Sequence, residues 1–70
     1  MKSNKKFVTI SKIGKDQFVK YRVNDLYNFT KFIVNKYPEF RYSNIFSNTG
    51  SNKGQLIYTF GKNKGLNVAY

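Results

Sequence analysis

The stretch NDLYNFTKFIVNKYP, residues 24–38, decides the fold because it carries a helical repeat of apolar side chains. The repeat places four of them on one stripe: Leu26, Phe29, Ile33 and Tyr37. Asn24 is predicted to be the N-cap, with Asp25 complementing the helix dipole. Pro38 ends the helix because a residue before proline avoids helical geometry. We therefore predict a helix over residues 25–37 whose apolar stripe is core.

Two strands are expected before the helix, at residues 6–13 and 17–23, and Gly14 and Lys15 lie between them. Glycine at the first position of a two-residue loop is typical of a type II′ hairpin turn. This turn puts six residues on one mixed face: Phe7, Thr9, Ser11, Phe18, Lys20 and Arg22. A three-residue loop would instead oppose the apolar Val8 and Ile10 to Arg22 and Lys20. We adopt the two-residue turn because it separates an apolar face from the mixed one.

Three further strands are expected after the helix, at residues 40–46, 55–60 and 66–70. In the first of these, Phe40 and Tyr42 share a face that we expect to be core, while Arg41 points outward. The segment SNTGSNKG, residues 47–54, is predicted to be a flexible loop.

The last two strands are predicted to form a hairpin around GKNKG, residues 61–65. Its alternation is clean, with these side chains on one face: Leu56, Tyr58, Phe60, Leu66, Val68 and Tyr70. The resulting order, ββαβββ, predicts an α+β domain in which one helix packs on an antiparallel sheet.

Length and composition indicate one small basic domain, residues 1–70, with residues 1–5 frayed. The chain has 13 Lys and Arg against 3 Asp and Glu, for a net charge of +10. Seven Phe and six Tyr supply the core area that so short a chain otherwise lacks, and a homodimer is left open as a further source of stability. Lysine, asparagine, isoleucine, phenylalanine and tyrosine are all plentiful, which suggests an AT-rich genome. Small basic proteins of this composition often belong to phages or mobile elements.

The residue types present exclude most kinds of catalytic centre. The chain has no Cys and no His, so disulfides, Cys/His zinc sites, Cys nucleophiles and His bases are absent. Asp25 and Glu39 lie at opposite ends of the predicted helix, about 20 Å apart at about 1.5 Å per residue, and Asp16 lies in a turn. We expect no catalytic residues, no cofactor and no metal. No segment resembles a signal peptide or a membrane span, so we expect a cytoplasmic protein without a membrane partner.

The mixed face of the first hairpin is the leading candidate site. Lys20 and Arg22 can attract phosphates, and Phe7 and Phe18 can stack on unpaired bases. Four further cations on loops or a strand face are candidates for phosphate contacts: Arg41, Lys53, Lys62 and Lys64. A purely structural role, with the rings covered by the helix and the cations only solvated, is the competing interpretation.

Two functions fit this pattern. The first is a non-enzymatic nucleic-acid-binding module, acting on DNA or RNA. The second is a small inhibitor or adaptor, of phage or mobile-element type, that covers an acidic or nucleic-acid-binding surface of a larger protein.

Overall fold

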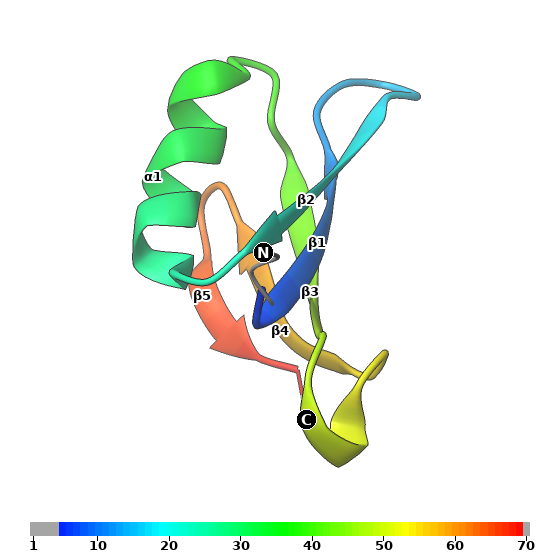
Figure 1. The fold of residues 1–70 in the computed structure, drawn as a ribbon. Helices are drawn as coiled ribbons and strands as arrows, with labels where there is room; N and C mark the ends of the chain where they lie inside the picture. The colour runs from blue at the N-terminus through cyan, green and yellow to red at the C-terminus, as the bar shows by residue number, and fades with distance from the viewer. Residues whose placement is uncertain (1–4, 70) are drawn as a thin grey trace.

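The computed structural model describes residues 5–69, which form an α+β domain with one sheet and one α-helix (Figure 1). The elements follow one another as β1 (Phe7–Lys12), β2 (Phe18–Val23), α1 (Leu26–Lys36), β3 (Tyr42–Ser47), the 3₁₀ turn η1 (Gly50–Asn52), β4 (Leu56–Gly61) and β5 (Gly65–Val68). All neighbouring strands are antiparallel, in the order β2-β1-β3-β4-β5. The predicted fold class and the order ββαβββ are confirmed. Two expectations, fraying of residues 1–4 and strand structure at Tyr70, lie outside the described residues.

The helix begins one residue later than expected, because Asp25 and not Asn24 is its N-cap. The Asp25 carboxylate accepts a hydrogen bond from the backbone N–H of Asn28, at 3.2 Å. The Asn24 side chain instead accepts from the backbone N–H of Lys6, at 2.8 Å, and so ties the start of β1 to the end of β2. At the other end Tyr37 has φ −120°, the extended geometry that the following proline favours.

The core lies between α1 and the sheet. Phe29, Ile33 and Phe40 are buried, with exposed fractions of 3%, 0% and 2%. Phe40 precedes β3 and reaches the core from a turn, in which its N–H donates to the Tyr37 carbonyl at 3.0 Å. Strand alternation therefore does not run from Phe40 to Tyr42. The prediction that Tyr42 is core is wrong, since Tyr42 lies on the other face of the sheet and is 39% exposed.

The first hairpin has a different register from the predicted one. Ser11 pairs with Val19 and Ile10 with Lys20, and the Ile13 N–H donates to the Gln17 carbonyl at 2.9 Å. The loop is thus three residues long, residues 14–16, and the two-residue turn is wrong. A shift of one residue moves one strand's side chains to the opposite face relative to its partner, so the predicted mixed face is split between the two sides of the sheet.

Small residues of the central strands explain this register. Four hydroxyl residues of β1 and β3 are buried on the helix side: Thr9, Ser11, Ser43 and Ser47. Ser11 and Ser43 share a hydrogen bond through their hydroxyls, and the Thr9 hydroxyl donates to the Tyr21 carbonyl at 3.4 Å. Among the described residues no buried side-chain polar atom lacks a partner. Short side chains allow close packing on the helix side of the sheet, whereas Val8 and Ile10 would need more space there.

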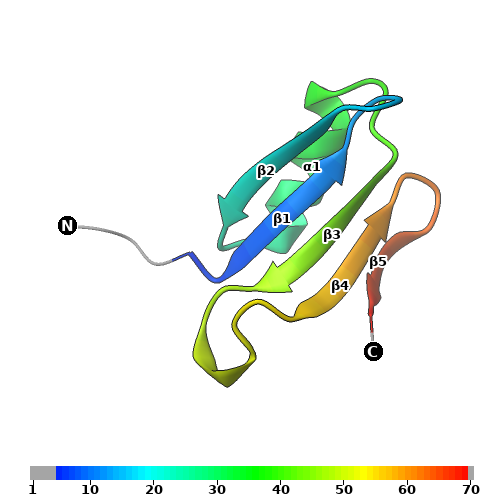
Figure 2. The same cartoon turned by 90° about the vertical axis from the view of Figure 1, so that its right-hand side faces the viewer.

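The last hairpin has the predicted alternation, with Tyr58 opposite Val68 and Phe60 opposite Leu66. A register shift between β3 and β4 places Leu56 opposite Phe46, which interrupts the alternation at that residue. In Figure 2 the helix is seen behind β1 and β2 but not behind β5. Within residues 5–69 no helix has the length and apolar character needed to cross a membrane.

Candidate nucleic-acid interface

The side of the sheet turned away from α1, which we call the open face, carries the candidate site (Figure 2). The strand register arranges its side chains in three rows across β2, β1 and β3. The rows are Phe18, Lys12 and Tyr42; then Lys20, Ile10 and Asn44; then Arg22, Val8 and Phe46. Every row therefore combines a cation with an apolar or aromatic side chain.

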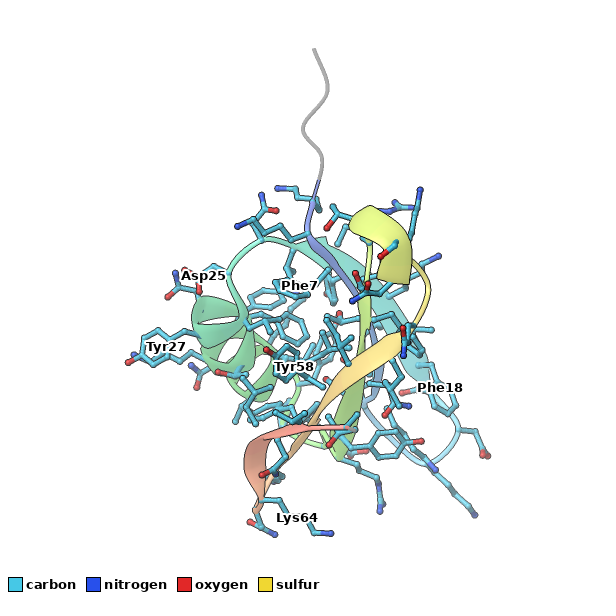
Figure 3. The ribbon with its side chains drawn as sticks, turned by 90° about the horizontal axis from the view of Figure 1, so that it is seen from below. Phe7, Phe18, Asp25, Tyr27, Tyr58 and Lys64 are labelled. Atoms are coloured by element: carbon cyan, nitrogen blue, oxygen red, sulfur yellow. The ribbon has the colours of Figure 1, made fainter. Side chains whose placement is uncertain are left out.

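Apolar side chains on the open face are accessible to a ligand. Phe18 is 56% exposed, and the exposed fraction of Ile10 is 37%. The Lys12 ammonium nitrogen lies 5.9 Å from the centre of the Phe18 ring, within reach of a cation–π interaction. Figure 3 shows Phe18 on the side of the sheet opposite the helix. An exposed ring beside a cation is a suitable surface for stacking on a base.

Half of the predicted mixed face does not belong to this site. Phe7 faces the helix side, where its ring lies 6.4 Å from that of Tyr58 with the planes at 68° (Figure 3), and Thr9 and Ser11 are fully buried. Placing Phe7 beside Phe18 on one surface was an error of register. The structure keeps Phe18, Lys20 and Arg22 together.

The sequence prediction missed the β1 and β3 side chains of the open face: Val8, Ile10, Lys12, Tyr42, Asn44 and Phe46. A signal for the first two was present in the sequence. The three-residue loop, which opposes Ile10 to Lys20 and Val8 to Arg22, is the one observed.

Three predicted cations converge at one end of the sheet. Arg41, Lys62 and Lys64 line a single hollow beside Tyr42, where β3 begins and the β4–β5 turn lies. The backbone N–H of Lys62 donates to the Arg41 carbonyl at 3.3 Å, which joins the two segments. Lys64 also lines a groove on the open face, with Asn44, Thr59 and Asn67 among its neighbours. This cluster of three cations therefore borders the open face.

Lys53 lies at the opposite end of the open face, in the loop between β3 and β4. The six residues of β3 separate it from the Arg41–Lys62–Lys64 cluster, a span of about 17 Å at about 3.4 Å per residue. The loop expected to be flexible contains η1, and its ends are joined by hydrogen bonds, including Gly54 N–H to the Ser47 carbonyl at 2.7 Å. Cations thus stand at both ends of the open face.

None of the side chains in these three rows is a carboxylate. Asp16 is in the β1–β2 loop, Asp25 caps the helix, and Glu39 follows the helix, so the strands contain no acidic residue. Glu39 shares a hollow with Arg41 and Lys62 at the edge of the site. Within the described part of the chain no group of three His, Cys, Asp or Glu could hold a metal ion. The potential over the open face is therefore set by its cations and favours an anionic ligand.

One tyrosine with a shifted pKa, Tyr21, lies on the helix side of the sheet. The hydroxyls of Tyr21 and Tyr37 are hydrogen-bonded at 2.7 Å. This bond, together with burial, raises the pKa of the Tyr21 phenol above its usual 10.0. The effect concerns the packing of α1 on β2 and not the open face.

Comparison with protein-family models, with curated proteins and with solved structures found no match for this chain. The open face is therefore the feature from which a function is inferred.

Proposed function

We propose that this protein is a non-enzymatic nucleic-acid-binding module that contacts DNA or RNA through its open face. The observation that supports this function is the repeated pairing of a cation with an apolar or aromatic side chain across three strands, with no carboxylate among them. Lys12, Lys20 and Arg22 attract phosphates, while the side chains between them offer contacts to bases. In the cell we assign this function to the cytoplasm.

Cations at the two ends of the open face extend the proposed contact surface. The Arg41–Lys62–Lys64 cluster and Lys53 would each hold phosphates of a strand that crosses the sheet between them. Each neutralised phosphate releases counterions, which is the main source of affinity for such a basic surface. The net charge of +10 adds a long-range attraction that speeds encounter.

The test is a salt titration of oligonucleotide binding. The logarithm of the affinity should fall linearly with the logarithm of salt concentration, by about 0.7–0.9 for each phosphate contacted. No binding at low salt, or an affinity that does not depend on salt, would contradict the proposal.

A second candidate function is the inhibitor or adaptor of phage or mobile-element type. The apolar side chains of Val8, Ile10 and Phe46 beside the cations also suit a protein partner that has an acidic or nucleic-acid-binding surface. A pull-down from lysate, with and without nuclease, separates the two functions. A defined protein retained after nuclease treatment would favour the inhibitor, whereas loss of all partners would favour nucleic-acid binding.

A further inference from the structure

One corner of the open face contains a shallow hollow of about 240 Å³. Its floor is apolar and consists of Val8 and Ile10 from β1 and Phe46 from β3. Its rim carries two cations from different elements, Lys20 on β2 and Lys53 in the loop after η1. We call this feature, defined by these five residues, the apolar hollow.

The loop that carries Lys53 on the rim of the apolar hollow is held in place by hydrogen bonds. The Ser47 N–H donates to the Gln55 carbonyl at 2.9 Å, and the Gly54 N–H donates to the Ser47 carbonyl at 2.7 Å. Asn48 fastens the loop to the start of β1, since its side-chain amide donates to the Lys5 carbonyl at 2.9 Å. Gly54 has φ +90°, which favours glycine, and this conformation sets the course of the chain beside Lys53. A site formed in advance loses little entropy when it binds a ligand.

The shape and charge of the apolar hollow indicate the group that it can hold. Pockets that enclose a whole small molecule measure about 300–1,000 Å³, so the apolar hollow takes one part of a larger ligand. The floor favours an uncharged ring, and the cations on the rim favour an anion on either side of that ring. A nucleic-acid strand presents this order, because each base projects from a backbone between two phosphates.

A duplex cannot use the apolar hollow in this way. Its bases are paired and stacked inside, so it would place phosphates over Val8, Ile10 and Phe46. We propose that the apolar hollow binds one unpaired nucleobase, with Lys20 and Lys53 on the neighbouring phosphates, and that the protein therefore selects single strands over duplexes. This inference rests on the proposed function and names the form of nucleic acid that the open face binds.

The test compares three ligands of equal length: an oligothymidine, the same strand with every base replaced by an abasic sugar, and a duplex. The wild-type protein should bind oligothymidine at least about fivefold more tightly than the abasic strand, because stacking contributes about 1–3 kcal/mol per base. It should also bind oligothymidine more tightly than the duplex.

The decisive variant is Ile10→Lys, which adds a cation and replaces one of the three apolar side chains of the floor. It should keep or increase the affinity for the abasic strand and lower the preference for oligothymidine by about fivefold or more. The matched control is Leu66→Lys, which adds the same charge to a strand residue of similar exposure, 42% against 37%, on the other face. That control should leave the preference for oligothymidine unchanged. Should Ile10→Lys fail to fold, Ile10→Thr removes apolar surface while remaining β-branched and gives the same readout.

The outcomes separate the two proposals. If the wild-type protein binds all three ligands equally, nucleic-acid binding stands and the base site is overturned. An equal loss of preference in Ile10→Lys and Leu66→Lys would also overturn it. If no ligand binds at low salt, both proposals fail.

Discussion

The two faces of the sheet differ in a way that simple hydrophobicity does not predict. On the helix side, β1 presents Thr9 and Ser11, which are fully buried. On the open face the same strand presents the larger and more apolar Val8 and Ile10, and Ile10 remains 37% exposed. On β1, closeness of packing, more than hydrophobicity, therefore accounts for which residues lie on the helix side. Apolar side chains left outside, beside cations, are the basis for proposing that this surface binds a partner.

The largest expected effect tests which face is core. Ile33→Ala should lower the free energy of unfolding by about 2–5 kcal/mol, because the side chain is fully buried between α1 and the sheet. Ile10→Ala, the same change on the open face, should cost about 1 kcal/mol or less. Chemical denaturation measures both, and equal losses would show that the open face is also core.

The next largest effect distinguishes Phe7 from Phe18, the two phenylalanines that the sequence analysis placed on one face of the first hairpin. Phe18→Ala should weaken single-strand binding by about 1–3 kcal/mol, because stacking is removed, and barely change stability. Phe7→Ala should lower the stability of the fold and barely change single-strand binding, because the Phe7 ring packs against Tyr58 on the helix side. Binding titrations and denaturation of both variants give the answer. Unfolding of the domain by Phe18→Ala would place that ring in the core and shift the interface to the lysines at the ends of the sheet.

A smaller effect concerns the cations of β2. Lys20→Ala or Arg22→Ala should weaken binding to all sequences, and each should reduce the slope of log affinity against log salt by about one, because one phosphate is no longer neutralised. Lys31→Ala is the control, since Lys31 lies on α1 with its ammonium nitrogen 4.4 Å from the centre of the Tyr27 ring. A larger decrease in affinity with Lys31→Ala than with Lys20→Ala would move the interface from the open face to the helix.

The smallest effect is a pH dependence that belongs to the helix side alone. The hydrogen bond with Tyr37 raises the pKa of Tyr21 in the folded protein. The neutral phenol therefore stabilises the fold below the unfolded pKa of 10.0, and this contribution is lost as pH rises above that value. Tyr37→Phe should bring the Tyr21 pKa back toward its usual value, as measured by tyrosinate absorbance, without changing oligonucleotide binding at neutral pH. A change in that binding would show that the two faces are coupled.

Local patterns were sufficient for much of the fold and for part of the site. The spacing of Phe29 and Ile33 identified the buried stripe of the helix, and the alternation in residues 55–69 identified the pairing of the last hairpin. Lys20 and Arg22 were placed on one face with Phe18 because residues two apart on a strand always share a face. These features depend on residues that are close in sequence, so the sequence determines them.

Which of two alternating faces lies inside was decided only by the tertiary structure. The local sequence of the first hairpin is compatible with a loop of two residues or of three. The two loops shift the pairing of β1 with β2 by one residue, and the three-residue loop is the one observed. The choice depends on packing on the helix side of the sheet, where Thr9, Ser11 and Ser43 are fully buried and hydrogen-bond to other residues. The same packing leaves Val8, Ile10 and Phe46 on the open face, and so creates the apolar hollow. A period of two along a strand separates two sets of side chains, but the element that packs on the sheet selects which set is buried.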